Sequence, residues 1–134
     1  MECRRGRHVV YLMHCHLIFV TKYRGKVLSA KALKKMRELM ESICAKNEVE
    51  LVEFNGEVDH VHLLINYPPK VQISRLVNAL KSITSRELKR HFPELNQVAW
   101  RKHSLWSPSY FAGSVGGAPI EILKHYIQQQ DTPH

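Results

Sequence analysis

The sequence contains little of what would place it in several large classes of protein. It has three cysteines, Cys3, Cys15 and Cys44, and no CxxC pair, which argues against a disulfide framework and against a zinc site built of cysteines. Histidines interrupt the apolar run of residues 8–20, and no stretch reaches the roughly 18 apolar residues of a membrane-spanning helix. We therefore expect a cytoplasmic protein that does not enter a membrane.

Acidic residues are also few, and this shortage sets the charge. The chain has 12 acidic residues against 20 lysines and arginines, which gives a formal net charge of +8 and a pI near 9.6. A small basic domain often binds a polyanion, because each phosphate that it neutralises releases counterions. Charge alone does not separate DNA from RNA or from an acidic membrane surface. The length of 134 residues, with 44% of them hydrophobic, predicts a single domain covering residues 1–134.

The spacing of the apolar residues predicts a mixed α and β protein. Strands are expected at residues 8–20, 49–55 and 60–66 and within 98–112, and helices at residues 30–47, 74–91 and from Pro119 onward. Ser29 is a suitable N-cap for the first helix. The order strand, helix, strand, strand, helix, strand, helix predicts an α+β fold. It consists of an antiparallel sheet, two helices on one side and a separate C-terminal helix.

The run Asp59-His60-Val61-His62 opens one of the predicted strands. Residues i and i+2 of a strand point to the same face, so His60 and His62 present two imidazoles side by side, which can bind a divalent metal ion. Alone the pattern is weak, because the chain has nine histidines and His14 and His16 share the same spacing. Ordinary core or surface histidines are the alternative interpretation.

The predicted helix 74–91 carries basic residues away from its apolar side. Its candidate DNA-binding residues are Arg75, Lys81, Arg86, Lys89 and Arg90. A solvated helix face is the ordinary explanation of such a pattern, and contact with DNA phosphates is the functional one. Spacing does not choose between the two.

The last predicted helix carries Tyr126 and Gln130 on one face, at positions i and i+4. A phenol can attack a phosphodiester. Its usual pKa near 10 makes it a poor nucleophile at neutral pH, unless a metal ion withdraws charge from the phosphorus. A helix tyrosine and a strand histidine pair therefore make chemical sense together. The chain has five tyrosines, and composition does not choose among them.

Three segments of the chain carry a resemblance to a known family. HLIFVTKYRGKVL, DHVHLLI and WSPSYFAGSVGGAPIEILKHYIQQQ occur in the order and spacing of the single-tyrosine transposases of small bacterial and archaeal insertion sequences. These enzymes belong to the histidine–hydrophobe–histidine class, and the similarity covers roughly residues 8–130. The family's N-terminal motif matches His16 to Arg24 but not His14. That match favours His60 and His62 as the metal pair and leaves His16 a mostly structural role.

The resemblance implies a ferredoxin-like or RRM-like fold and a site assigned by position. It implies that His60, His62 and Gln130 bind Mg²⁺ or Mn²⁺ and that Tyr126 is the nucleophile. Lys124 and His125 flank the tyrosine and are candidates to assist with charge or proton transfer. The implied function is cleavage and rejoining of single-stranded DNA through a 5′-phosphotyrosine.

The resemblance also implies a DNA partner and a partner subunit. Members of the family are homodimers that bind DNA hairpins near the transposon ends. Their tyrosine helix can pack against the histidine pair of the partner, so that each active site is built from two chains. In this sequence the Gly116-Gly117 loop permits the last helix to pack on its own chain or on another.

Two other functions remain open on the sequence. A plain nuclease would keep the metal and use water in place of Tyr126, although no histidine or carboxylate stands out as a general base near the motif. A non-catalytic single-strand binder would stack bases on aromatic residues such as Trp106, Tyr110 and Phe111.

Overall fold

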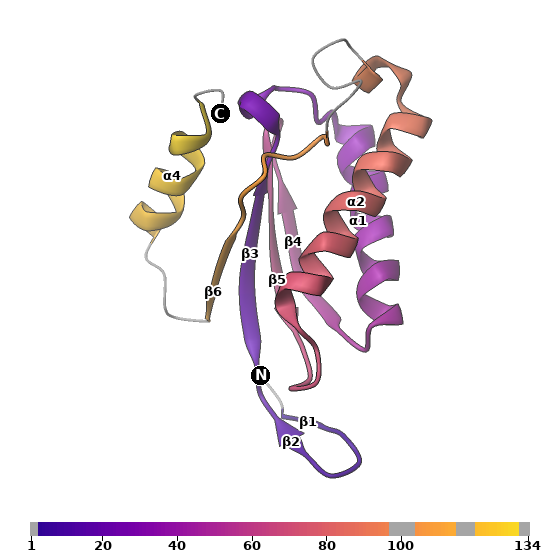
Figure 1. Ribbon diagram of the computed structural model, residues 1–134, viewed down its shortest axis with the longest axis vertical. Coiled ribbons are helices and arrows are strands. Elements are labelled where there is room, and N and C mark those ends of the chain that lie inside the picture. Colours follow the sequence, from indigo (N-terminus) through magenta and orange to yellow (C-terminus); the bar gives the residue numbers. More distant parts are fainter. Residues whose placement is uncertain (1–2, 97–103, 115–119, 132–134) are drawn as a thin grey trace.

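The computed structural model describes residues 3–96, 104–114 and 120–131. Its centre is a four-stranded antiparallel sheet in the order β4-β5-β3-β6. The strands are β3 (His14–Val20), β4 (Glu50–Gly56), β5 (His60–Asn66) and β6 (Phe111–Ser114). Helices α1 (Ala30–Lys46) and α2 (Ile73–His91) cover one face of the sheet (Figure 1). This confirms the α+β arrangement that the sequence pattern predicts and the ferredoxin-like fold that the family resemblance implies.

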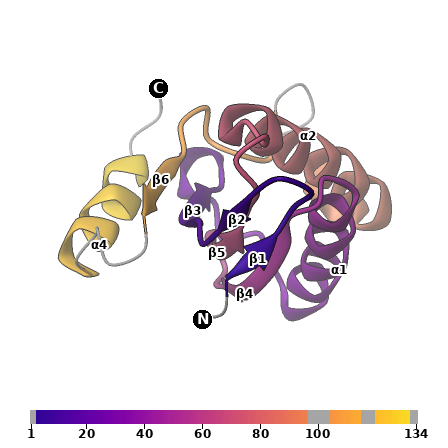
Figure 2. The ribbon, with the colours of Figure 1, turned by 90° about the horizontal axis from the view of Figure 1, so that it is seen from below.

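The last helix lies on the other side of the sheet. Figure 2 shows α4 (Ile120–Gln128) beside β6, with α1 and α2 on the far side of the strands. A short 3-10 turn, η3 (Gln129–Asp131), follows α4 and contacts η1 (Lys22–Arg24), the turn that follows β3. The C-terminal end of α4 is therefore close to the end of β3, where Val20 pairs with His60 of β5.

The two faces of β5 have different roles. Val61, Leu63 and Ile65 are 0% exposed and belong to the core that α1 and α2 complete. Because successive residues of a strand point to opposite faces, His60 and His62 project from the face that these helices leave uncovered. The helices hold β5 in place by burying its apolar side. Burial of each large apolar side chain stabilises the folded protein by about 2 kcal/mol. The histidines remain available for other contacts.

The long helices form where their caps and apolar stripes predict. The Ser29 Oγ accepts a hydrogen bond from the Ala32 N–H at 3.1 Å and so caps α1. Met36 and Met40, one turn apart, are 0% exposed on the side of α1 that faces the core. In α2 the buried apolar residues are Leu76, Val77, Leu80 and Leu88.

The predicted strand 8–20 is shorter than expected, because its first half belongs to a separate hairpin. β1 (Arg4–Arg5) pairs with β2 (Val10–Tyr11), and the central strand begins only at His14. The Arg4 guanidinium donates to the carbonyl and the side-chain oxygen of Asn66, both at 3.1 Å, and so ties the hairpin to the end of β5. Both β2 and β3 are rich in apolar residues, so composition did not indicate that the hairpin ends and the central sheet begins between Tyr11 and His14.

The segment before β6 lies between α2 and α4. Residues 97–103 and 115–119 fall outside the described residues, so the expectations for the first part of 98–112, for Gly116-Gly117 and for Pro119 fall there too. Trp106 is 1% exposed, and its indole N–H donates to the Thr84 hydroxyl at 3.0 Å. The expectation that Trp106 offers a stacking surface for bases is therefore wrong, because the ring is part of the core. Among the described residues no helix is long and apolar enough to cross a membrane.

Candidate active site

His60 is held by a chain of two charged groups, Asp59 and Arg24. Its Nδ1–H donates to Asp59 Oδ1 at 2.8 Å, and Asp59 Oδ2 accepts from Arg24 Nε at 2.8 Å. Burial would raise the pKa of Asp59, but hydrogen bonds and charges from His60 and Arg24 outweigh it and hold this pKa below its usual value. The carboxylate therefore stays ionised, accepts the Nδ1–H and leaves Nε2 of His60 as the free lone pair.

The turn that supplies Arg24 has an unusual backbone. Tyr23 and Arg24 have φ values of 57° and 55°, in the left-handed region that residues with side chains rarely adopt. Each such residue costs roughly 1–2 kcal/mol, so the surrounding contacts must hold the turn in place. Thr21 provides such contacts, since its hydroxyl lies 2.7 Å from the Gly25 carbonyl and 3.1 Å from the Asp59 carbonyl. The strained turn keeps the guanidinium against Asp59.

His62 has a histidine neighbour that the sequence did not predict. Its Nε2 lies 2.7 Å from His16 Nδ1, and the two rings stack with centroids 4.9 Å apart. Burial lowers the pKa of His62, and the charge of His16 lowers it further, which favours a neutral imidazole. His14 instead lies with Nε2 3.2 Å from the Asn66 amide nitrogen. His14 and His16, the alternative pair that the sequence offered, therefore contact two different residues, Asn66 and His62.

Tyr126 and Gln130 are brought together by two serines. The Tyr126 hydroxyl lies 2.9 Å from Ser109 Oγ, and Gln130 Oε1 accepts from Ser107 Oγ at 2.7 Å and from Ser109 Oγ at 3.3 Å. Gln130 is 7% exposed. Burial raises the pKa of Tyr126, and the Ser109 hydrogen bond lowers it in part. The phenol is therefore protonated at neutral pH in the protein as it stands.

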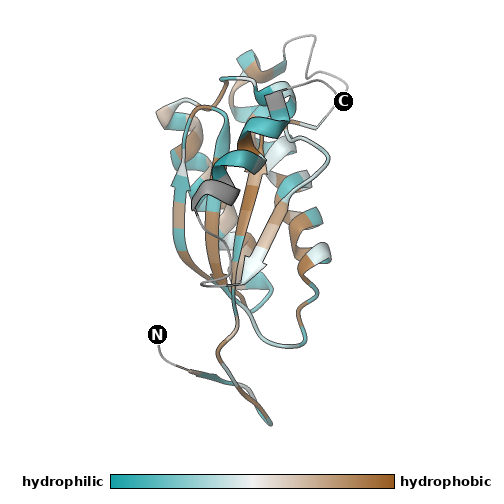
Figure 3. Ribbon diagram, turned by 90° about the vertical axis from the view of Figure 1, so that its left-hand side faces the viewer, coloured by the Kyte–Doolittle hydropathy of each residue, from teal (hydrophilic) through white to brown (hydrophobic). Residues whose placement is uncertain are grey.

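Strand register relates this helix to the histidine pair. The Tyr126 ring contacts Phe111 at a centroid distance of 5.9 Å, and Phe111 pairs with Ile18, which pairs with His62. Paired residues of neighbouring strands lie on the same face. Tyr126 thus packs over the row that contains His62, two strand spacings away, or about 10 Å between backbones. Figure 3 looks onto this side of the molecule and shows α4 in front of the sheet.

Gln130 lies over the neighbouring set of paired residues, the one that contains His60. Ser107, its hydrogen-bond partner, donates its backbone N–H to the Val20 carbonyl at 2.7 Å, and Val20 pairs with His60. The structure therefore gathers His60, His62, Tyr126 and Gln130 at one end of the sheet, on one face. Sequence reasoning did not single out Ser107 and Ser109, although both lie in the WSPSYFAG part of a segment that carries the family resemblance. Their contacts with Tyr126 and Gln130 follow only from the three-dimensional arrangement.

Lys81 fixes the segment that carries these serines. Its ammonium donates to three successive carbonyls, those of Ser107 at 2.6 Å, Pro108 at 3.3 Å and Ser109 at 3.1 Å. Burial lowers the pKa of Lys81 to about 8. The ammonium thus donates to one partly buried and two exposed carbonyls of its own protein. Its assignment as a DNA-binding residue stays a prediction, beside this structural role.

The other predicted DNA-binding residues lie on the helical layer. Arg75, Arg86 and Arg90 are exposed, and Arg86 and Arg90 form ion pairs with Glu87 at 3.7 Å and 2.8 Å. Burial and the charge of Lys22 lower the pKa of Lys89. α2 covers the face opposite the histidines, so these basic residues and the histidine pair lie on different sides of the sheet.

The donor set suits a divalent metal ion in part. Within the described ranges no three histidine, cysteine or acidic side chains form a metal-binding group. Two imidazoles and the amide oxygen of Gln130 are the available donors. His60 has the outer-sphere carboxylate that metal-bound histidines usually have, with Nε2 free. The Nε2 of His62 and the Oε1 of Gln130 are hydrogen-bonded, and each must share or exchange that contact to bind a metal.

The fold and the site define a ferredoxin-like protein with a histidine pair and a tyrosine helix on one face of its sheet. Residues 9–130 match the sequence model of the IS200-like transposases. The ISDra2 transposase TnpA of Deinococcus radiodurans is 32% identical over 130 residues, covering 97% of this chain and 92% of that protein. The chain belongs to the IS200-like transposase family, whose activity is the cleavage and transfer of DNA.

Two further relatives agree with this. The transposase for insertion sequence element IS200 of Salmonella typhimurium is 26% identical over 117 residues, covering 85% of this chain and 76% of that protein. A crystal structure of a transposase candidate from Deinococcus radiodurans R1 has a TM-score of 0.81 and 33% identity, covering 98% of this chain and 99% of that one.

Proposed function

We propose that this chain cleaves and rejoins single-stranded DNA at insertion-sequence ends, with Tyr126 as the nucleophile. The observation that supports the proposal most is the register: Tyr126 packs on Phe111, in the same row of the sheet as His62. A phosphate bound at the histidine pair would therefore lie on the same face of the sheet as this phenol.

His60, His62 and Gln130 are the residues that would hold Mg²⁺ or Mn²⁺. A divalent ion supplies Lewis-acid polarisation of the scissile phosphate and stabilises charge on its oxygens. Asp59 orients His60 for this role, and burial keeps His62 neutral. Gln130 is a neutral ligand, so it leaves the positive charge of the ion for the phosphate.

The covalent step follows from the chemistry of a phenol. The Tyr126 oxygen bonds to phosphorus and loses its proton, while the bond from phosphorus to the 3′ oxygen breaks and that oxygen takes up a proton. The products are a 5′-phosphotyrosine and a free 3′-hydroxyl. The ester keeps the bond energy, so a 3′-hydroxyl of another strand can displace Tyr126 and rejoin the DNA.

The proposal extends to the partners. DNA hairpins near the insertion-sequence ends are the expected ligands, and a homodimer in the cytoplasm is the expected assembly. In the single chain α4 lies over the sheet to which it is covalently joined. An exchange of α4 between subunits would build the same constellation from two chains.

A covalent adduct is the direct test. Wild-type protein is incubated with a labelled single-stranded hairpin oligonucleotide and Mn²⁺, and the adduct is separated on a denaturing gel. Tyr126→Phe should abolish it, because the attacking oxygen is removed, and a chelator should abolish it in the wild type. Tyr110→Phe is the matched control, since it removes a hydroxyl from the same region. An adduct that persists in Tyr126→Phe refutes the assignment, and cutting without an adduct indicates a plain nuclease.

Mixing two inactive variants tells a same-chain site from a composite one. His60→Ala and Tyr126→Phe are each expected to be inactive. If the site is assembled in one chain, the mixture also stays inactive. If α4 is exchanged, mixed dimers contain one intact site and recover adduct formation.

A further inference from the structure

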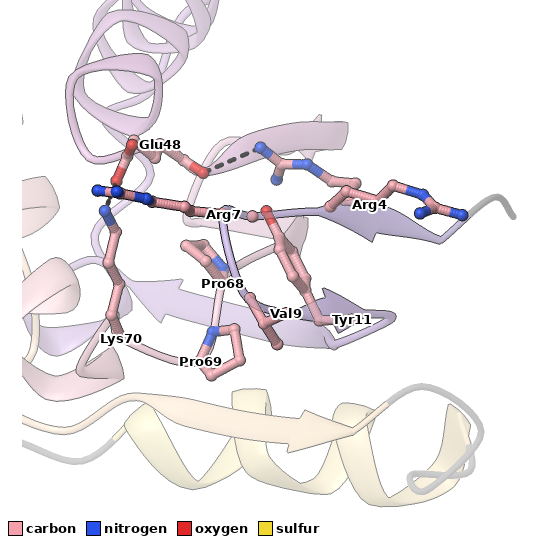
Figure 4. Close-up of a pocket in the computed structure, with 10 residues that line it drawn as sticks. Arg4, Arg7, Val9, Tyr11, Glu48, Pro68, Pro69 and Lys70 are labelled. Carbon is pink, nitrogen blue, oxygen red and sulfur yellow. Dashed lines mark hydrogen bonds and ion pairs between the residues drawn. The ribbon is translucent and has the colours of Figure 1, made fainter.

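The N-terminal hairpin borders a cavity that the proposed active site does not use. The cavity has a volume of about 580 Å³ and lies between β1–β2 and the turn that follows β5 (Figure 4). One wall is made by Val9 and Tyr11 of the hairpin and by Pro68 and Pro69 of the turn. The other carries cations from both elements. Hairpin and turn meet because Arg4 bonds to Asn66 and to the Glu48 carbonyl, each at 3.1 Å.

The charge of this cavity is mostly positive. Arg4, Arg5, Arg7 and Lys70 line it, against the single carboxylate of Glu48, which forms an ion pair with Lys70. Figure 4 shows Arg7 reaching across the cavity toward this ion pair. Arg5 and Arg7 are exposed, and neither makes a hydrogen bond or ion pair with any described residue. Both guanidinium groups therefore keep their N–H donors for a ligand such as phosphate, which they can bind in a bidentate manner.

We propose that this cavity is a second DNA-binding site, in which Arg5 and Arg7 hold the sugar–phosphate backbone. Guanidinium groups bind the phosphate oxygens, and Val9 and the two prolines offer an apolar surface to the sugar. The inference rests on the proposed function, because it assumes DNA as the polyanion. It adds a surface on β1, which precedes the residues matched to the family model.

The position of the cavity defines which part of the DNA would bind. β5 runs from His60, at the active-site end, to Asn66, beside the hairpin. Six steps of about 3.4 Å separate the two ends by about 20 Å. A DNA duplex covers that length in about six base pairs. The site would therefore bind a hairpin stem or flank that extends away from the cleavage site.

The test measures DNA affinity against salt for the double variant Arg5→Gln and Arg7→Gln. The probe is a labelled oligonucleotide with a hairpin and a single-stranded flank. The matched control is Lys31→Gln with Lys34→Gln, which removes the same charge from two exposed residues of α1, in the layer opposite the histidine face. Each lost phosphate contact lowers the salt slope by about 0.7 on a single strand and about 0.9 on a duplex stem, so two lost contacts weaken binding by roughly 25- to 60-fold at about 0.1 M salt. The control should bind like the wild type.

Several outcomes are distinguishable. Equal affinity and equal salt slope for wild type and the Arg5/Arg7 variant overturn the inference, as does binding only to phosphatidylglycerol vesicles and not to the oligonucleotide. If the wild type forms no covalent adduct but the Arg5/Arg7 variant binds DNA more weakly, the proposed function fails and this site stands. An unchanged Tm in the variant, expected from the absence of described partners, shows that weaker binding does not come from unfolding.

Discussion

Replacing Lys81 by methionine removes the ammonium from the segment 107–109 and keeps an apolar stem of similar length. In the protein this ammonium donates to the carbonyls of Ser107, Pro108 and Ser109. The same segment holds Tyr126 and Gln130 through its serine hydroxyls. The substitution therefore tests whether a residue of α2 positions the nucleophile from the opposite side of the sheet.

Two effects of similar size oppose each other in the stability of this variant. Burial lowers the pKa of Lys81 to about 8, from about 10.5 in an unfolded chain, which corresponds to at most about 3.5 kcal/mol against the charged form. The bond to the Ser107 carbonyl, which is partly buried, contributes roughly 1.5–3 kcal/mol, and the two exposed carbonyls regain water when the lysine is lost. At neutral pH we expect the free energy of unfolding to change by less than about 1 kcal/mol.

The pH dependence has a definite sign. Between about pH 8 and pH 10.5 the unfolded chain holds a proton on Lys81 that the folded chain has released. The free energy of unfolding therefore rises with pH in this window for the wild type relative to Lys81→Met. Urea denaturation of both proteins at several pH values measures the difference, with Lys34→Met as the exposed control. A difference that stays flat across the window would show that the carbonyls keep Lys81 charged.

The activity of Lys81→Met is the second readout. Adduct formation should slow by about tenfold, which corresponds to an activation free energy raised by about 1.4 kcal/mol when the tyrosine is less well positioned. The salt slope of DNA binding should stay that of the wild type. A slope that falls by about 0.7–0.9 would instead mark Lys81 as a phosphate contact. Normal adduct formation would refute the positioning role.

Three further substitutions test other parts of the site. Asp59→Asn should weaken Mn²⁺ binding by roughly 10–100-fold, because His60 loses its orienting carboxylate, and calorimetry showing unchanged affinity would contradict this. Ser109→Ala should raise the pKa of Tyr126 further, since the hydrogen bond lowers it, so the pH profile of adduct formation should move to higher pH; an unmoved profile counts against the contact. Trp106→Phe should lower the free energy of unfolding by about 2 kcal/mol, from lost volume and a lost hydrogen bond, and an unchanged urea midpoint would argue against it.

Local patterns predicted most of the elements but not how they meet. The N-cap at Ser29 and the alternation in 60–66 depend on neighbouring residues only, so the first helix and the histidine strand matched the expected bounds closely. The hairpin at residues 4–11 was missed, because the apolar run 8–20 continues across the point where the chain leaves the sheet. Burial of Trp106 depends on contacts with α2 that lie about twenty residues away along the chain.

The site was predictable in its motif residues and not in their surroundings. His60 and His62 share a face by strand geometry alone. The contact of His16 with His62, and the rows that join Phe111 to His62, depend on register, which no local pattern specifies. The roles of His60, His62, Gln130 and Tyr126 come from the resemblance and stay predictions until chemistry tests them.

The central claim is that the histidine pair and the tyrosine surround one divalent ion, and paramagnetic broadening by Mn²⁺ tests it without any DNA. Protein labelled with 3-fluorotyrosine is titrated with Mn²⁺ and followed by ¹⁹F NMR, with Tyr126→Phe used to assign the resonance. We expect the Tyr126 signal to disappear at low Mn²⁺ while that of Tyr67, beyond the far end of β5, remains sharp. The effect should be lost in His60→Ala. A Tyr126 signal that stays sharp while Mn²⁺ is bound would contradict the account.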